Sequence, residues 1–270
     1  MDLIDLVANR VTVIAEGEWA EDRVRVYSAS FFAPKITREM EVAAIARFIT
    51  RRESNPKLFN GPARHLLCSK CSVGDNGFGS LELALGPISY AVFDICRKEL
   101  AEALGWNIDG LPIGVGMSVV VLTSDFKIVM HRRGRDVDFP GALTLVGGIL
   151  DQDRPFEHVR QELREELGIE RHEVGELLLL GISHRLEQRI NNEFDFFARV
   201  FVSSGQLKQR QSSVEDKEGE LNFMECDPGV VQAFVMERHK EMLPGQVFCL
   251  IQAGRHLWGS EWSEIRGGLQ

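Results

Sequence analysis

The stretch GGILDQDRPFEHVRQELREELGI, residues 147–169, decides the fold of this chain. An apolar segment at residues 142–146 precedes it and predicts a strand that ends at the glycine pair. Pro155 suits the first turn of a helix and Gly168 suits its end. One apolar stripe at helical spacing runs between them, made of Phe156, Val159, Leu163 and Leu167. The sequence therefore predicts a strand, a glycine turn and a helix in succession.

Three carboxylates crowd one side of this predicted helix. Glu162 and Glu166 stand one turn apart, and Glu165 is a neighbour of Glu162. Their repulsion destabilises the helix unless a ligand offsets it, and a hard divalent cation such as Mg²⁺ prefers oxygen ligands. A solvated acidic helix face is the alternative interpretation. The preceding glycine turn favours a metal site, because strand, glycine turn and acidic helix together are typical of a binding site.

This stretch resembles the Nudix box, a pattern of Gly, five residues, Glu, seven residues and then Arg-Glu-apolar-x-Glu-Glu-x-Gly-apolar. On this chain the first Gly is Gly147, and the final block runs over residues 162–169. Asp153 stands where the pattern has its first Glu, and Gln161 stands where it has Arg. In the family those two positions help to hold the metal-binding acids in place. The resemblance implies an α/β fold, a Nudix-like α/β/α sandwich with a mixed sheet, over residues 109–255.

The resemblance also implies the roles of the box residues. Catalysis falls to Glu162, Glu165 and Glu166, and the carbonyl of Gly147 joins these acids as a metal ligand. Mg²⁺ is the expected cofactor, with Mn²⁺ as an alternative. A metal at this place neutralises phosphate oxygens and lowers the pKa of a bound water, and hydrolysis of a diphosphate requires both.

Short matches outside the box resemble the UDP-glucose and UDP-galactose hydrolase subfamily (type 22). They lie at residues 58–61, 85–90, 111–116, 140–141 and 178–182. This resemblance implies Mg²⁺-dependent hydrolysis of a UDP-sugar to UMP and a sugar 1-phosphate. Two alternatives stay open. One is hydrolysis of ADP-ribose or another nucleoside diphosphate derivative. The other is a Nudix-like nucleotide-binding regulatory protein with little turnover, which the departures at Asp153 and Gln161 favour.

Substrate-binding residues are expected outside the box. The group Arg132, Arg133 and Arg135 follows a predicted strand, and a guanidinium is a planar fork that suits phosphate. A charged hairpin end is the alternative interpretation of that group. At the turn that contains Asn60, the next glycine allows close backbone approach and the amide suits a base edge. An ordinary loop turn is the plainer interpretation of these residues.

A further carboxylate is expected to assist the box acids from elsewhere in the chain. Glu193 is favoured because it opens a predicted strand that could face the same end of the sheet. The other candidates lie on a polar segment and are Glu215, Glu218 and Glu220. For each of these acids a solvated surface carboxylate is the alternative.

The rest of the pattern divides the chain into three parts. Residues 1–108 predict a smaller α+β region that packs on the core, with strands at 11–15 and 23–27, a helix at 36–52, a hairpin over 64–68 and 80–85, and a helix at 88–104. Residues 109–255 predict strands at 115–122, 126–131, 177–182, 193–202 and 221–225, helices at 230–240 and 246–253, and a mobile polar loop at 206–220. Residues 256–270 predict a C-terminal tail.

Composition bounds the partners and the compartment. An apolar share of 44% and a charged share of 26% are those of an ordinary soluble globular protein. A net charge of −9 argues against nucleic-acid binding by phosphate neutralisation, whereas a single nucleotide needs only one local Arg or a metal. No apolar run approaches the roughly 20 residues of a membrane span, and the first ten residues lack the signals of a signal peptide.

These observations together predict a cytoplasmic protein with a small-molecule nucleotide substrate and no nucleic-acid or membrane partner. A homodimer is compatible with them. The chain has five cysteines, and Cys68 with Cys71 forms a lone CSKC without a second pair, so neither a disulfide framework nor a zinc site is expected.

Overall fold

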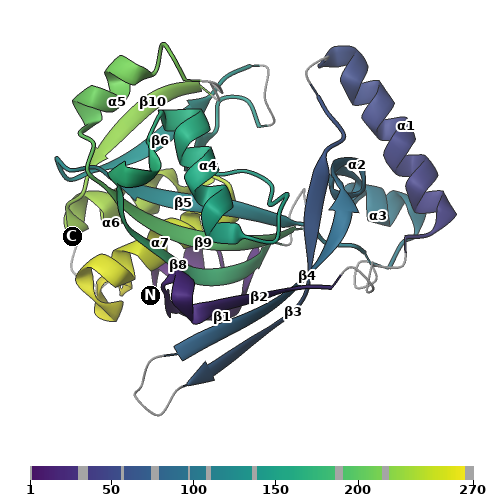
Figure 1. Ribbon diagram of the computed structural model, residues 1–270, viewed down its shortest axis with the longest axis horizontal. Coiled ribbons are helices and arrows are strands. Elements are labelled where there is room, and N and C mark those ends of the chain that lie inside the picture. Colours follow the sequence, from purple (N-terminus) through teal and green to yellow (C-terminus); the bar gives the residue numbers. More distant parts are fainter. Residues whose placement is uncertain are drawn as a thin grey trace.

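A mixed β-sheet forms the centre of the molecule (Figure 1). The computed structural model describes residues 2–29, 36–55, 58–73, 79–96, 98–107, 111–135, 139–185, 191–214 and 219–264. Within them the main sheet has seven strands in the order β1-β8-β9-β5-β6-β10, with β7 paired to β6. The pair β5 and β9 is parallel, and the other named pairs of this sheet are antiparallel. The strands are β1 (Val11–Trp19), β5 (Val115–Leu122), β6 (Lys127–Arg133), β7 (Leu143–Thr144), β8 (Val174–Arg185), β9 (Asn191–Val200) and β10 (Gly219–Glu225).

Helices cover both faces of this sheet. Helix α4 (Pro155–Leu167) lies on one face, where its apolar stripe packs against Val119 and Val121 of β5. Helices α6 (Pro228–Arg238) and α7 (Pro244–Trp258) lie on the other face, against Val120 of the same strand. Alternate residues of a strand point to opposite faces, so the continuous apolar run of β5 supplies both cores. The fold is therefore α/β with a mixed sheet between helices, as the sequence predicts.

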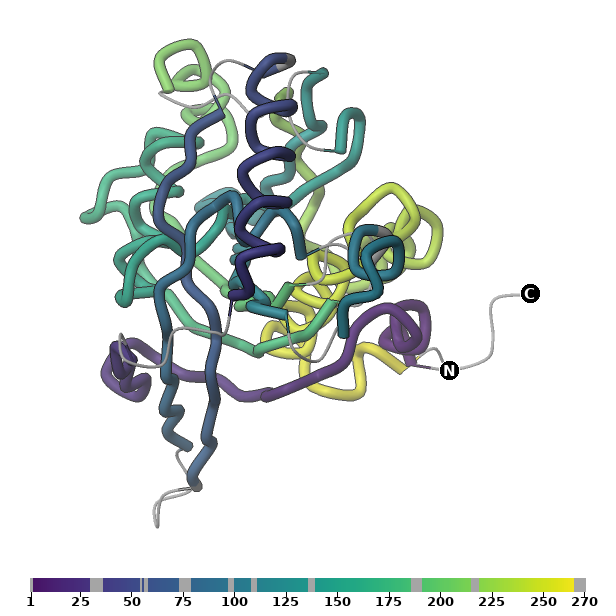
Figure 2. Tube along the Cα trace, turned by 90° about the vertical axis from the view of Figure 1, so that its right-hand side faces the viewer, coloured from purple at the N-terminus to yellow at the C-terminus, as the bar shows by residue number. Residues whose placement is uncertain are grey.

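A second, three-stranded sheet projects from the main one. Its order is β2-β4-β3, formed by β2 (Val24–Ser28), β3 (Pro62–Val73) and β4 (Gly79–Ser89). Figure 2 shows the long β3–β4 hairpin extending past the main body, with α1 (Arg38–Ser54) alongside it. The short helices α2 (Tyr90–Ile95) and α3 (Lys98–Leu104) complete this part. Buried Asp94 of α2 anchors α1, because it lies 2.9 Å from Arg47 Nε and 2.6 Å from an Arg51 Nη.

The first strand belongs to the main sheet rather than to the smaller one. The strands predicted at residues 11–15 and 23–27 both form, but β1 pairs with β8 while β2 pairs with β4. Trp19 at the end of β1 is 3% exposed and packs in one core with apolar side chains of β4. The two sheets therefore share a core, and a domain boundary near residue 108 stays a proposal.

The two ends of the described chain meet beside α7. Asp2 forms a β-bridge with Glu264, and Arg255 Nη2 lies 2.6 Å from Asp2 Oδ2. Helix α7 extends to Trp258, and Trp262 packs on that ring at 5.0 Å between centroids. Leu257, Trp258 and Trp262 are thus packed against the core. No helix among the described residues is long and apolar enough to cross a bilayer.

Two predicted elements differ in the structure. The helix predicted at 88–104 is instead the end of β4 followed by α2 and α3. The loop predicted at 206–220 contains α5 (Ser204–Arg210) and the start of β10, while residues 215–218 lie outside the described residues. The helix forms because Ser203 and Gln206 make a capping box and Leu207 is fully buried, so one apolar contact suffices in a polar segment.

Candidate active site

The glycine pair before α4 lies against β5 and between two of the box acids. Met117 N donates to Gly148 O at 2.8 Å, and a Cβ at Gly147 would overlap the Met117 carbonyl. Gly147 N donates to Glu166 Oε1 at 3.1 Å. A Cβ at Gly148 would overlap the carboxylate of Glu162. Close approach to backbone therefore requires glycine at position 147, whereas a Cβ at position 148 would displace the carboxylate of Glu162. The strand–turn–helix succession predicted from the sequence places two carboxylates on this turn.

The third box acid, Glu165, has partners on α4 itself. Its side chain is 26% exposed, and it accepts a hydrogen bond from Gln161 Nε2 at 2.9 Å. Arg164 Nη2 lies 3.5 Å from the same oxygen. Among the residues that the structure describes, no three His, Cys, Asp or Glu side chains converge as a metal site. Glu162 and Glu166 nevertheless supply the oxygen donors that Mg²⁺ takes, with the backbone of the turn beside them, so this donor set fits that ion.

Two histidines that the sequence interpretation missed contact the box acids. His158 Nδ1 lies 2.8 Å from Asp151 Oδ1, and its Nε2 lies 3.1 Å from Glu162 Oε1. Burial lowers the pKa of His158, but the hydrogen bond and charge of Glu162 and the charge of Asp151 outweigh burial, so its pKa is raised. His158 stands four residues before Glu162, which places both on one helix face and is the signal that could have found it.

The second histidine, His131 on β6, lies beside Glu166. Its Nε2 is 3.3 Å from Glu166 Oε2, and both side chains are almost fully buried. Burial, with the nearby charge of Arg133, lowers the pKa of His131 to about 4. The imidazole is therefore neutral at neutral pH. Its contact with Glu166 is a polar contact of an uncharged ring and not an ion pair. Nothing in the local pattern of β6 indicates this contact.

The three predicted phosphate-binding arginines do not come together. Arg132 donates to Gly141 O at 2.8 Å and lies 3.1 Å from Glu241 Oε2, on the face of the sheet that α6 covers. Arg133 follows it on β6 and so faces the α4 side, close enough to lower the pKa of His131. Arg135 is exposed beyond the strand. Strand alternation thus leaves Arg133 on the side of the box acids.

Two of the four further carboxylate candidates lie in the part of the chain that the structure describes. Glu193 is 5% exposed and accepts hydrogen bonds from Ser118 Oγ at 2.5 Å and Asn191 Nδ2 at 2.7 Å. It lies under Gly245 of α7, on the face of the sheet opposite α4. Glu220 is exposed on β10 opposite Arg132. The other two candidates, Glu215 and Glu218, lie outside the described residues.

Two further residues, Asn60 and Asp195, differ in their surroundings. Asn60 Oδ1 accepts a hydrogen bond from Ala91 N at 2.8 Å, in the first turn of α2. Asp195 stands two residues after Glu193 and is fully buried. Burial, and then the charge of Glu193, raise the pKa of Asp195 well above its usual value.

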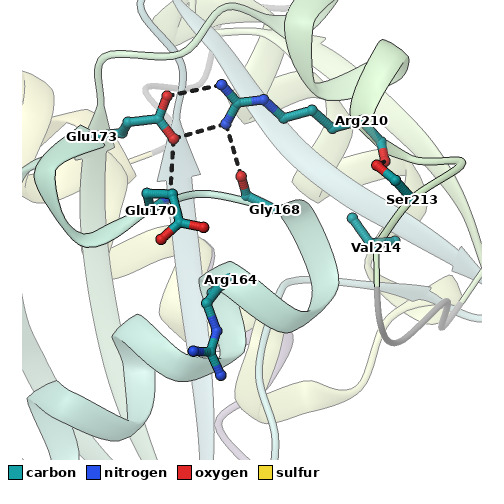
Figure 3. Close-up of a pocket in the computed structure, with 7 residues that line it drawn as sticks. All are labelled: Arg164, Gly168, Glu170, Glu173, Arg210, Ser213 and Val214. Carbon is teal, nitrogen blue, oxygen red and sulfur yellow. Dashed lines mark hydrogen bonds and ion pairs between the residues drawn. The ribbon is translucent and has the colours of Figure 1, made fainter.

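Two cavities flank α4. The larger, of 660 Å³, lies at the C-terminal end of the helix (Figure 3). It contains none of the box acids, and Figure 3 shows the guanidinium of Arg210 held by both carboxylate oxygens of Glu173, at 2.7 and 2.8 Å. The hydrogen bonds from Arg210 hold the pKa of Glu173 at about 2. We therefore interpret this end of the helix as a structural junction.

The smaller cavity, of 350 Å³, runs along the exposed side of α4. It includes Gln161, which holds Glu165, and is bordered by several guanidinium groups. Arg160 among them is occupied, since it lies 2.6 Å from Glu21 and 2.7 Å from Glu157. Arg164 is 55% exposed and lies at the junction of both cavities. An anion in this groove would lie beside Glu165.

Comparisons with known proteins find structural likenesses of low similarity. No family model matches the chain, and no curated protein matches it. A Nudix hydrolase from Nitrosomonas europaea is 13% identical over 53% of this chain and 90% of its own, with a TM-score of 0.41. The Nudix domain of Shewanella oneidensis NrtR, solved with ADP ribose, is 14% identical over 53% and 87%, with a TM-score of 0.40.

A third solved structure is the MutT Nudix hydrolase from Burkholderia pseudomallei. It is 22% identical over 40% of this chain and 80% of its own, with a TM-score of 0.31. All three of these solved structures are Nudix proteins.

Proposed function

We propose that this chain is a Nudix-type hydrolase that cleaves the pyrophosphate bond of a nucleoside diphosphate derivative. One observation carries the proposal: Glu162 and Glu166 both contact the glycine turn from the C-terminal half of α4, where they lie one helical turn apart. Carboxylates brought together beside backbone oxygens are the ligands of a hard divalent cation. The groove beside Glu165, with Arg164 at its edge, is a place for the anionic substrate.

The roles of the residues follow from this placement. Glu162 and Glu166, with the carbonyl of Gly147, would hold Mg²⁺ or Mn²⁺. Such an ion, when bound, neutralises phosphate oxygens and lowers the pKa of water. Glu165, held by Gln161, would take a proton from the attacking water. The oxygen of that water forms a bond to one phosphorus while the bridging P–O bond breaks. Arg133 lies on the same side of the sheet and would meet a phosphate.

The favoured substrate is a UDP-sugar, which would yield UMP and a sugar 1-phosphate. This choice is supported by the short matches outside the box at residues 58–61, 85–90 and 111–116. ADP-ribose is the alternative substrate, and a nucleotide-binding protein with little turnover is the alternative class. The expected acid from outside the box is the least supported part, because Glu193 is already held by Ser118 and Asn191.

A substrate screen with one acid variant tests the proposal. The full chain is incubated with UDP-glucose, ADP-ribose or nucleoside triphosphates and Mg²⁺, and phosphate is measured after phosphatase treatment of the products. Glu166→Gln keeps the shape and removes the charge, so we expect turnover to fall by about 100-fold or more. Asp195→Asn is the matched control, since it changes another buried carboxyl on the opposite face of the sheet, and it should retain turnover.

Each result of the screen decides between the readings. Release from UDP-glucose above all other compounds supports the UDP-sugar substrate, and release from ADP-ribose above UDP-glucose replaces it. Full metal-dependent turnover by Glu166→Gln would remove the site assignment. Binding of the nucleotides without release by the unmutated chain favours the regulatory class. Circular dichroism of each variant confirms that the fold is retained.

A further inference from the structure

The loop that leads into α4 is held by a residue of the smaller sheet. Arg64 on β3 lies with its Nε 2.5 Å from Asp153 Oδ1, and its side chain is 18% exposed. The backbone contributes as well, since Arg64 N donates to Leu150 O at 2.8 Å. Arg64 thus contacts both ends of the segment 150–153, and Asp153 lies 89 positions away from it in sequence.

This segment connects to the acids through one histidine. Asp151 lies inside the segment, and its Oδ1 is 2.8 Å from His158 Nδ1. His158 Nε2 is in turn 3.1 Å from Glu162 Oε1. The glycine turn that receives Glu162 and Glu166 immediately precedes the same segment. A clamp on residues 150–153 therefore limits where both acids can lie.

Helix α4 contacts Asp151 and Gln152 of this segment, but in the described contacts none of its cations reaches Asp153. The side chain of Gln161 donates to Glu165 and accepts a hydrogen bond from Gln152 Nε2 at 3.3 Å. It carries no charge that could pair with Asp153. Asp153 is 33% exposed, and it forms an ion pair with Arg64. A partly buried carboxylate keeps a fixed position only when a donor holds it, and a charge-assisted bond is the stronger kind. The guanidinium that the segment needs comes from β3.

We infer that Arg64 is a positioning residue of the candidate active site, which makes the β3–β4 hairpin a structural part of that site. The inference rests on the proposed function for its consequence in turnover. Its physical content does not depend on turnover, because Arg64 orders the turn at Gly147 whatever the chemistry is.

Arg64→Gln tests the inference by two measurements that need no substrate. The first is the Kd for Mn²⁺, which should rise about tenfold or more, as for other residues that orient metal ligands. The second is hydrogen exchange of the segment around Gly147, whose N–H is bonded to Glu166. Exchange there should become faster when the clamp is lost. If the unmutated chain shows turnover, Arg64→Gln should lower kcat by a larger factor than the factor by which it changes the KM for the nucleotide.

Arg160→Gln is the matched control. Arg160 has nearly the same exposure, 17%, and also joins α4 to a distant segment through Glu21 at 2.6 Å. It does not contact residues 147–153 in any described interaction. Its loss removes a comparable ion pair, so stability should fall similarly while the Mn²⁺ affinity and the exchange near Gly147 stay as in the unmutated chain.

A rescue variant separates positioning from simple destabilisation. The double variant Arg64→Gln, Gln161→Arg moves the guanidinium from β3 to α4. The wild-type side chain at position 161 contacts Gln152, the residue that precedes Asp153 in sequence. We expect this double variant to recover most of the exchange protection near Gly147 and most of the Mn²⁺ affinity. Recovery by a cation placed on another element would not follow from a merely structural role of Arg64.

The outcomes are distinct from those that decide the proposed function. Exchange near Gly147 that is the same in Arg64→Gln and Arg160→Gln overturns the inference, with or without turnover. Absence of Mn²⁺ binding and of turnover in the unmutated chain overturns the proposed function, while the exchange result still decides Arg64. Should Arg64→Gln fail to fold, Asp153→Asn removes the same ion pair from its more exposed end and gives the same readouts.

Discussion

Gln161 lies on α4 between Glu165 and the loop residue Gln152, at the position where the Nudix box pattern has Arg. Its Nε2 donates to Glu165 and its Oε1 accepts from Gln152 Nε2 at 3.3 Å, so it bridges the helix and the loop without a charge. Arg at this position can still donate to Glu165 and adds a charge near Asp153. We therefore expect Gln161→Arg to keep or raise the turnover of the unmutated chain.

Steady-state kinetics at saturating Mg²⁺ measure this prediction. Gln161→Ala is the companion variant, since it removes the hydrogen bond to Glu165 and should lower kcat if Glu165 handles the proton of the attacking water. A large loss of turnover in Gln161→Arg, with the fold intact, would show that Gln161 is adapted to a different local geometry.

Residue spacing predicted part of this site because helix geometry is local. Glu162 and Glu166 lie one turn apart, and the structure places both on the glycine turn. The direction of Glu165 is also a matter of helix phase. The contacts of Arg64 and His131 are different, because they depend on which strands lie beside α4, and no local pattern carries that information.

At the scale of elements, α5 is fixed to the end of α4 by one arginine. Arg210 donates to Gly168 O at 2.7 Å and to both carboxylate oxygens of Glu173. Hydrogen bonds to charged partners contribute about 1.5–3 kcal/mol each where they are partly buried. We expect Arg210→Gln to lower the free energy of unfolding by about 2 kcal/mol at pH 7, as measured by urea denaturation.

This effect should depend on pH in one direction. Arg210 lowers the pKa of Glu173 from 4.5 to about 2, so the ionised form is favoured by folding. Such a group stabilises the fold above its unfolded pKa, and the contribution is lost as the pH falls from 4.5 toward 2. The difference between the variant and the unmutated chain should therefore shrink over that range. Arg199→Gln, which removes a more exposed pair at 3.6 Å, should change stability little at any pH. A difference that grows on acidification would contradict the assignment.

Periodicity predicted the elements that bury a whole face and missed those held by single contacts. The strand at 115–122 was predicted with its bounds unchanged, because its eight consecutive residues are all buried and most of them are apolar. Helix α5 was missed because only its cap and Leu207 distinguish it from a polar loop. The division of residues 88–104 into the end of β4, α2 and α3 was also missed. All three elements contribute to one hydrophobic cluster, which contains Ile88, Phe93 and Ala101, so the apolar pattern does not show where one element ends and the next begins.

At the scale of the whole molecule, residues before 108 take part in both sheets. Strand β1 forms the edge next to β8, with Val11 opposite Arg185 and Trp19 opposite Leu179. Leu3 and Val7 are buried in the core beneath α7. Sequence order suggested one N-terminal region, but pairing between strands distant in sequence decides the sheet, and that pairing is not visible in a single chain.

The isolated fragment 108–270 should therefore fail to fold as a stable unit. The fragment lacks β1, so one edge of β8 is unpaired, and an exposed edge strand promotes aggregation. The truncation also removes Trp19 and Leu3 from the core, and burial of each such large side chain contributes about 1.5–3 kcal/mol to the free energy of unfolding. Size-exclusion chromatography and urea denaturation measure this. Adding residues 1–29 as a separate chain should recover part of the soluble fraction, whereas a cooperatively folded fragment alone would contradict the shared core.

Point variants are consequently the way to ask whether the N-terminal part contacts the substrate, and Asn60 offers a discriminating pair. Its Oδ1 accepts from Ala91 N, so Asn60→Ala removes both this hydrogen bond and the amide donor, whereas Asn60→Asp keeps the acceptor alone. We expect both variants to fold and both to raise KM for UDP-glucose relative to a poorer nucleotide-sugar, because the amide donor is the group that can read a base edge. A higher KM in Asn60→Ala alone would make the residue a support of α2, and unchanged KM and preference in both would remove Asn60 from the site.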